Sequence, residues 1–177
     1  MLTLMKNLKI AAFIILAVLG LAITTTAAEI QVFFSPGGGC TAAIIQEINQ
    51  AKSEILVQAY SFTSAPIAKA LLNAHKRGVK VSVILDKSQR TQKYSAATFL
   101  ANSKIPTYID NKHAIAHNKI MIIDQSVVIT GSFNFTKAAE EKNAENLLII
   151  KSRALAARYN KNWDEHKAHS DNYLEQN

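Results

Sequence analysis

Short apolar runs separated by amphipathic stretches dominate the chain from residue 29 onward. Two of these runs, Ile120–Ile123 and Leu147–Ile150, contain no polar residue at all. Such runs are typical of strands in a sheet that is covered on both faces. We expect strands at Ile30–Phe34, Ile55–Tyr60, Val79–Leu85, Ile120–Ile123, Val127–Thr130 and Leu147–Ile150.

The stretches between these runs predict helices at Thr41–Ala51, Pro66–Arg77, Tyr94–Asn102 and Arg153–Lys167. Pro66 favours a helix start and Gly78 a helix end. In the last stretch Leu155, Tyr159 and Trp163 share one face, so Trp163 is expected in the core. No repeat of 20–50 residues is found. We therefore predict one α/β domain over residues 29–177, with a mixed, mostly parallel sheet covered by helices on both faces.

The first residues have a different pattern. Lys6 and Lys9 precede an uninterrupted run of 14 apolar or small residues, Ile10–Ile23, and small residues follow. This order predicts a secretory signal peptide over residues 1–28, cleaved after Ala22 or Ala28. The alternative is an uncleaved anchor, but a membrane span needs about 20 residues. We expect a bacterial periplasmic or secreted protein that has no stable membrane association after cleavage.

The composition of the chain limits the kinds of site that it can form. The chain has 177 residues, 20 Lys and Arg against 13 Asp and Glu, and a net charge of +7. Its one cysteine, Cys40, excludes an intrachain disulfide and any metal motif that needs several cysteines. We expect Cys40 to be a buried small apolar residue.

The most informative segment runs from His117 to Asn134. His117 and Lys119 are two apart at the start of a strand, so their side chains face the same side. The following turn folds the chain back, and a reflection about Gln125 places Asn134 beside His117 and Ser132 near Lys119. These groups together could hold one phosphate.

Asp124 does not join them by this geometry. Five residues of strand separate it from Lys119, roughly 16 Å at 3.3 Å per residue. It is expected to cap the turn or to pair with a distant cation. A local Ser-His-Asp triad is therefore disfavoured, and Gly131-Ser132 lacks the Gly-x-Ser-x-Gly pattern of a nucleophile elbow.

These residues resemble the phospholipase D superfamily. Its pattern is His-x-Lys, four residues, Asp, six residues and Gly-Ser-x-Asn, and His117, Lys119, Asp124 and Gly131–Asn134 match all six fixed positions. By chance such a match occurs at about one starting point in 10⁸. The size and the N-terminal pattern resemble the bacterial Nuc-type endonucleases of that superfamily.

The resemblance implies a mechanism without metal or cofactor. His117 would attack phosphorus and form a phosphohistidine, and a second motif histidine would protonate the leaving oxygen. Lys119, Asn134 and Ser132 would hold the phosphate oxygens, and Glu145 would support an imidazole. This chain has only one His-x-Lys pair. The resemblance therefore implies a homodimer in which the partner subunit's His117 supplies the acid.

The substrate is inferred from charge. Lys87, Arg90 and Lys93 follow the end of a predicted strand, where α/β proteins place ligand sites. A basic segment there fits the backbone of DNA and RNA without base selection. This favours a sequence-nonspecific endonuclease, although a solvated basic face remains the simpler interpretation of the charges. A phospholipid hydrolase or transferase would want an exposed apolar rim, and the sequence indicates none. A non-catalytic DNA-binding module would not need the complete motif.

Two further site hypotheses are disfavoured. His113 and His117 are four apart with Asp110 nearby, but the segment lacks the glutamate of a zinc-peptidase helix and leads into a strand, so no metal is predicted. Gly37–Gly39 could hold a phosphate at a helix start. Without the following Lys-Ser/Thr of a nucleotide loop, a plain turn is the better interpretation.

Overall fold

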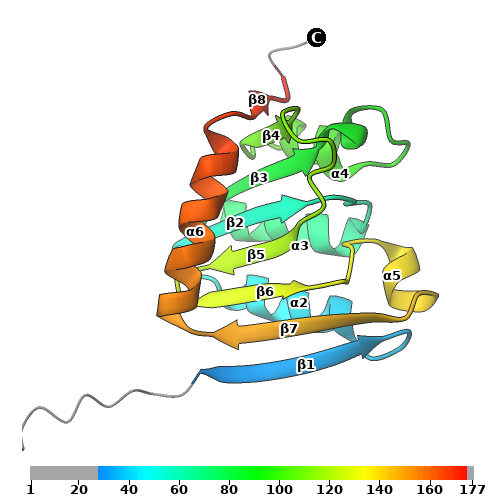
Figure 1. Cartoon of the computed structure of the whole chain (residues 1–177), viewed down its shortest axis with the longest axis vertical. Helices are drawn as coiled ribbons and strands as arrows, with labels where there is room; N and C mark the ends of the chain where they lie inside the picture. The colour runs from blue at the N-terminus through cyan, green and yellow to red at the C-terminus, as the bar shows by residue number, and fades with distance from the viewer. Residues whose placement is uncertain (1–27, 175–177) are drawn as a thin grey trace, which may run out of the picture.

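The computed structural model describes residues 28–174. The predicted signal peptide lies outside the described residues apart from Ala28, so it stays a prediction. Eight strands form one sheet in the order β1-β7-β6-β5-β2-β3-β4-β8 (Figure 1). The strands are β1 (Glu29–Ser35), β2 (Glu54–Ala59), β3 (Lys80–Asp86), β4 (Thr107–Asp110), β5 (Lys119–Ile123), β6 (Val127–Gly131), β7 (Glu145–Lys151) and β8 (Asp171–Asn172).

The α/β class and the mixed sheet are confirmed, but the expectation that most pairings are parallel is wrong. Only β2–β3 and β3–β4 are parallel, and the other five pairings are antiparallel. The two parallel pairs are joined by the connections that contain α3 and α4. The turn between β5 and β6 is too short for a crossover and forces a hairpin.

Helices cover both faces, as predicted. The helices α2 (Cys40–Gln50), α3 (Ala65–Lys76) and α4 (Ala96–Asn102) lie behind the sheet in Figure 1, and α6 (Arg153–Lys167) crosses its front. Two short helices, η1 (Lys87–Arg90, a 3₁₀ helix) and α5 (Lys137–Glu141), follow β3 and β6.

The sheet separates two apolar cores, and β5 contributes to both. Met121 and Ile123 belong to the large core beneath α2, α3 and α4. Ile120 and Ile122 belong to the smaller core beneath α6, together with Trp163. This division is why the run has no polar residue.

Two sequence expectations about the core are confirmed. Trp163 is buried, and its Nε1 donates to the Val57 carbonyl at 2.9 Å, which anchors α6 to the centre of the sheet. Cys40 is fully buried as a small apolar residue. Among residues 28–174, no helix has the length and apolar character needed to span a bilayer.

Candidate active site

The β5–β6 hairpin brings the two halves of the motif together. Met121 lies opposite Ile129 and Ile122 opposite Val128, which is the predicted reflection about Gln125. Asp124 and Gln125 have φ of 50° and 51°, the left-handed backbone of a tight hairpin turn. His117 comes before the paired residues of β5 and Phe133 comes after those of β6. Both motif segments therefore lie at the open end of the hairpin, opposite its turn.

His117 and Lys119 lie together around the Tyr60 ring. Nζ of Lys119 donates to the His117 carbonyl at 2.7 Å. The Tyr60 ring centroid is 4.6 Å from the His117 ring and 5.2 Å from the Lys119 Nζ. His117 is exposed, whereas Lys119 is buried, with only 7% of its surface exposed. An exposed imidazole thus stands above a buried cation.

Tyr60 was not among the residues that the motif pointed to. It directly follows β2, whose last residue, Ala59, pairs with Lys119, and its backbone N–H donates to the Asn118 carbonyl at 2.8 Å. In the sequence, Tyr60 stands out only as an aromatic residue at the end of a predicted buried strand. Its position beside Lys119 follows only from the pairing of β2 with β5.

The ammonium of Lys119 is partly removed from water, which is energetically unfavourable for a charged group. Burial lowers its pKa, because desolvation disfavours the charged form, and the nearby Glu145 carboxylate partly opposes this shift. A buried ammonium near an exposed imidazole is suited to receive a bound anion, which would restore its lost hydration.

The segment after β6 fixes Asn134. Phe133 and Phe135 on either side of it are fully buried anchors. The Asn134 Oδ1 is buried and has no hydrogen-bond partner among the described residues. Buried amides normally have partners. An amide oxygen only accepts, so its missing partner must be a donor such as an N–H group, whereas a phosphate oxygen would be bound by the Nδ2 of Asn134.

Ser132 and Glu145 are held by contacts within the chain. The hydroxyl of Ser132 accepts from the Asn146 N–H at 3.1 Å, which ties the motif loop to β7. Glu145, the first residue of β7, accepts from the Asn143 side chain at 3.1 Å. In the described part of the chain no hydrogen bond joins Glu145 to the His117 ring, so its support of an imidazole stays a prediction.

Asp124 lies at the other end of β5, as expected, and caps a neighbouring segment. Its carboxylate accepts from the backbone N–H groups of Lys52, Ser53 and Glu54 at 2.8–3.0 Å. The Ser53 hydroxyl adds a fourth bond at 2.7 Å. The acid of the motif therefore stabilises the start of β2 and does not contact the site.

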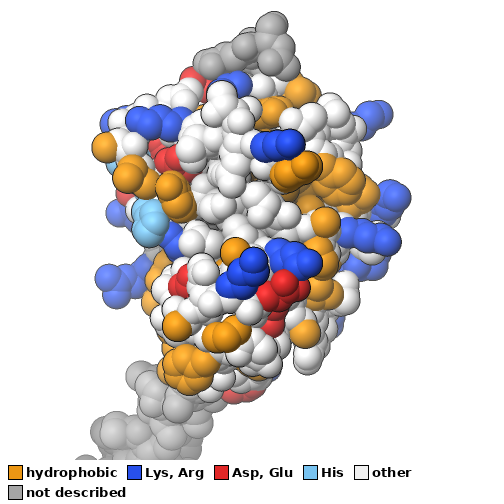
Figure 2. All heavy atoms as spheres, turned by 90° about the vertical axis from the view of Figure 1, so that its right-hand side faces the viewer, with side chains coloured by type: hydrophobic (Ala, Val, Ile, Leu, Met, Phe, Trp, Pro, Cys, Tyr) orange, Lys and Arg blue, Asp and Glu red, His pale blue; other side chains and the backbone are white. Residues whose placement is uncertain are grey.

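The predicted basic residues occupy η1 and the loop after it. Lys87 and Lys93 are exposed, whereas Arg90 is half-buried, and its Nη1 donates to the Tyr173 carbonyl at 3.4 Å. Figure 2 views the edge toward which the arrows of β2 and β3 point. Lys and Arg side chains appear there at separate places around a largely uncharged centre, with apolar patches between them.

The structure gives no support to a phosphate site at Gly37–Gly39 or to a metal held by His113 and His117 together. The glycine turn before α2 is occupied by the chain itself, because Oε2 of Glu140 accepts from the Thr41 N–H at 2.7 Å. His113 and His117 do not face one another: the His113 ring contacts Asp110, whereas the His117 ring contacts Tyr60.

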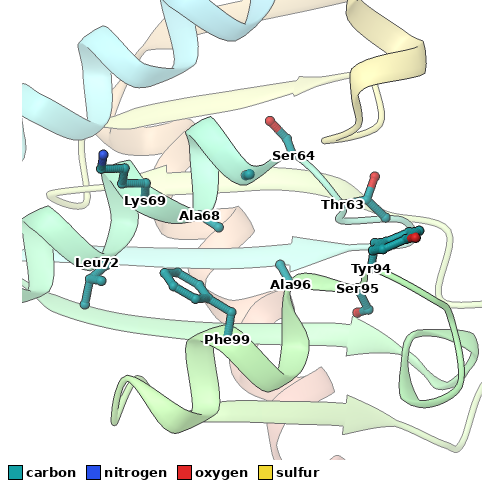
Figure 3. A pocket seen from close by; sticks show the side chains of 10 residues that line it. Thr63, Ser64, Ala68, Lys69, Leu72, Tyr94, Ser95, Ala96 and Phe99 are labelled. Carbon is teal, nitrogen blue, oxygen red and sulfur yellow. The ribbon is translucent and has the colours of Figure 1, made fainter.

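An apolar groove borders the site, and the expectation of no apolar rim is wrong. It has a volume of about 550 Å³ and lies between α3 and α4 (Figure 3). Tyr94 and Phe99 on its rim are 77% and 44% exposed. The N–H groups of Thr63 and Ser64, at its end, donate to the Phe135 carbonyl.

The His-x-Lys pair leads into β5, and Gly-Ser-x-Asn runs on from the last residue of β6. Together with the sheet, these two segments define a phosphodiesterase of the phospholipase D type. The chain belongs to this family. The family model described as "Cardiolipin synthase, PLD-like domain" matches residues 44–167. The α/β fold and the resemblance expected from the motif are thereby confirmed.

Individual relatives agree with this assignment. A Rickettsia felis protein named phospholipase D is 48% identical over 140 residues, which cover 79% of this chain and 70% of that protein. The crystal structure of Nuc, a phospholipase D family member from Salmonella typhimurium, superposes with a TM-score of 0.80 at 40% identity, covering 83% of this chain and 99% of that one. NucT from Helicobacter pylori gives a TM-score of 0.75 at 25% identity, covering 82% and 99%. A mitochondrial cardiolipin hydrolase of Xenopus laevis is 31% identical over 119 residues, which cover 65% of this chain and 57% of that protein.

Proposed function

We propose that the protein is a sequence-nonspecific endonuclease that cleaves DNA and RNA without a metal ion. The exposed imidazole of His117 above the buried ammonium of Lys119 carries this proposal. His117 attacks phosphorus, the bond to the leaving oxygen breaks, and the partner subunit's His117 protonates that oxygen. Water then hydrolyses the phosphohistidine and returns a proton to the acid histidine.

The other site residues act on the charge of the transition state. Lys119 and the amide of Asn134 bind the non-bridging oxygens, on which negative charge builds. Ser132 keeps the motif loop on β7 and has its hydroxyl proton free to donate. Glu145 stabilises the imidazolium of His117 through its charge.

Nucleic acid is favoured as substrate by two features. Lys87, which begins η1, and Lys93, on the loop after it, are exposed at the edge of the sheet where Tyr60 also lies. The similarity to Nuc extends over 99% of that chain. A flexible phosphate backbone needs positive charge along its path but no deep pocket.

Cleavage of plasmid DNA in excess EDTA tests the chemistry. We expect cleavage to persist in EDTA and to fall at least about 10⁴-fold in His117→Ala, because the nucleophile is removed. His75→Ala, a histidine on α3, is the matched control and should keep full activity. Circular dichroism confirms that each sample is folded in EDTA. Loss of cleavage by folded protein in EDTA contradicts the metal-free mechanism, and DNA binding without turnover would indicate a binding module.

The composite site is tested with a mixed dimer. We propose a homodimer, because one chain carries one motif histidine and the reaction uses two. A dimer of one unmodified and one His117→Ala subunit should be about as inactive as the His117→Ala homodimer. Half of the full activity in the mixed dimer, or an active monomer on sizing chromatography, would refute the shared site.

A phospholipid hydrolase is the second candidate function, and the apolar groove favours it. The groove reaches the segment that carries the motif asparagine, and its rim of Tyr94 and Phe99 could hold an acyl chain. If lipid is a substrate, Phe99→Ser lowers hydrolysis of phospholipid vesicles and leaves plasmid cleavage unchanged. Equal rates of lipid release by the variant and the unmodified protein would dismiss this use of the groove.

The compartment follows from the N-terminal pattern. We propose export to the periplasm or the medium, with removal of the leader. Mass spectrometry of the protein recovered from the periplasmic and extracellular fractions should find an N-terminus at Ile23 or Glu29. Recovery of the full chain from the membrane fraction would favour the anchor.

A further inference from the structure

Three histidines that the mechanism does not use surround one buried carboxylate. Asp110 ends β4 and is completely buried. His113 follows it in the segment leading to His117, His166 lies in the last turn of α6, and His169 lies in the turn directly after that helix. Residues 53 to 59 positions apart in sequence therefore meet at one point.

The distances within this cluster are short. Nδ1 of His166 lies 2.8 Å from the Asp110 Oδ2, Nδ1 of His113 lies 2.9 Å from it, and Nε2 of His169 lies 3.4 Å from it. One ligand atom from each of the four residues lies within 4.8 Å of all the others. In tetrahedral zinc sites, bonds of 2.0–2.2 Å place neighbouring ligand atoms about 3.3 Å apart.

Hydrogen bonding within the chain does not account for all four groups. A single carboxylate oxygen offers two lone pairs, yet three ring nitrogens converge on the Oδ2 of Asp110. The Nε2 of His169 is buried and has no hydrogen-bond partner within the described part of the chain. A cation among these atoms would use the lone pairs of all three rings at once.

The surroundings of the carboxylate fit this role. The other oxygen of Asp110, Oδ1, accepts from the backbone N–H groups of Lys112 and His113 at 3.1 and 3.3 Å. These bonds orient Oδ2 toward the histidines, as outer contacts do in metal sites. The His113 side chain is 43% exposed, against 13% for His166 and 22% for His169, so an ion can enter past His113.

We infer that Asp110, His113, His166 and His169 form a structural zinc site. Three imidazoles and one carboxylate are ligands that Zn²⁺ accepts in tetrahedral geometry, and four protein ligands leave no open position for catalysis. The ion would join α6 to the end of β4 and restrain the segment that carries His117. This site is separate from the phosphodiester site, where the reaction needs no metal.

Zinc titration of the EDTA-treated and dialysed chain tests the site. We expect one zinc per chain and a rise of about 5–10 °C in the unfolding midpoint when zinc is at about 100 times its dissociation constant. Co²⁺ in its place should give the visible absorption of a tetrahedral nitrogen–oxygen site. His169→Gln should lose the stoichiometric binding and the rise, and His75→Gln should retain both.

The choice of variants keeps the two proposals distinguishable. His169→Gln leaves the bonds of Asp110 to His113 and His166 intact, and circular dichroism in the absence of zinc verifies that it folds. His117→Ala should bind zinc normally while it loses DNA cleavage. No saturable one-to-one binding, or equal binding by His169→Gln, would overturn the zinc site whatever the result of the nuclease assay.

Discussion

Asp124 occupies the fixed acidic position of the motif, yet its carboxylate bonds to the segment before β2. Partial burial by itself would raise the pKa of Asp124, but the hydrogen bonds from Glu54, Ser53 and Lys52 outweigh it and hold the pKa below its ordinary value. The motif thus contains one residue that organises the fold beside others proposed to act on phosphate.

Replacing this carboxylate should weaken the fold at neutral pH. Asp124→Ala leaves three N–H groups without their acceptor, and we expect the free energy of unfolding to fall by about 1–3 kcal/mol. Urea denaturation measures the difference. Asp164→Ala, an exposed acid on α6, is the control and should change the stability little.

The same carboxylate predicts a pH dependence. Because its folded pKa is lowered, its contribution is complete above the unfolded pKa, about 3.9, and is lost as the pH falls through the lower folded pKa. The stability difference between the unmodified protein and Asp124→Asn should therefore shrink in acid below about pH 4. A difference that stayed constant down to the lowest pH at which both fold would contradict this.

Lys119 predicts a pH dependence of anion binding. Its burial lowers the pKa, so its charge is lost at a lower pH than in an exposed lysine. Cleavage also needs the proton of the acid histidine, so DNA binding by His117→Ala is the measurement that isolates the lysine. This binding should weaken on the alkaline side below the pKa of an ordinary lysine, about 10.4. Adding Lys119→Arg, which keeps its charge, should remove that decline, and an unchanged decline would assign it to another group.

At the scale of elements, the contact between β6 and β7 explains the glycine of the motif. Gly131 has φ of 148° and lies opposite Leu147, and a Cβ atom there would stand 2.2 Å from the Asn146 carbonyl oxygen. The small residue is needed for two strands to approach, and the loop that carries Ser132 and Asn134 depends on that approach.

Gly131→Ala should therefore lower the free energy of unfolding by more than backbone strain alone would. Gly78 also has a positive φ, 91°, but a Cβ there meets open space. We expect Gly78→Ala to lower the free energy of unfolding by about 1–2 kcal/mol from its left-handed backbone. Gly131→Ala should lose more than that and should lower cleavage as well. Equal losses in thermal denaturation would mean that the strands can separate without cost.

Sequence analysis predicted the longer helices and strands, in which apolar residues recur at a regular spacing. Helix α6 has the predicted bounds, Arg153–Lys167, and the six predicted strands are each found within two residues at either end. The missed elements, β4, β8, α5 and η1, have two to five residues, too few for an apolar period to be recognised. They form because the neighbouring strand or helix supplies their contacts.

At the scale of the whole molecule, the charge is less concentrated than the sequence suggested. Arg90 lies against the Tyr173 ring and Lys87 donates to the His113 carbonyl at 3.1 Å, so part of the basic segment holds the fold together. Lys93 stays exposed beside Tyr94. Of the three cations in this segment, Lys87 and Lys93 have exposed side chains that can reach a polyanion, although Lys87 also makes this backbone contact.

Salt dependence of DNA binding tests this assignment. If both lysines contact phosphates, Lys87→Ala with Lys93→Ala should reduce the slope of log K against log salt by about 2, at about 0.9 per contact. Lys52→Ala with Lys161→Ala changes the net charge equally at exposed positions elsewhere and should leave the slope nearly unchanged. Identical slopes for the two pairs would leave the basic segment as a solvated face.

The sequence by itself determined the family, the hairpin and the motif whose residues we propose as the site, because these depend on local periodicity and on fixed spacing along one short segment. It did not determine the antiparallel majority of the sheet, the Tyr60 contact, the apolar groove or the histidine cluster. Each of these joins residues from different elements, and such contacts depend on strand order and on packing of helices against the sheet. His113 illustrates the difference, because its nearest motif histidine in sequence is His117, whereas the tertiary structure turns its ring toward His166 and His169.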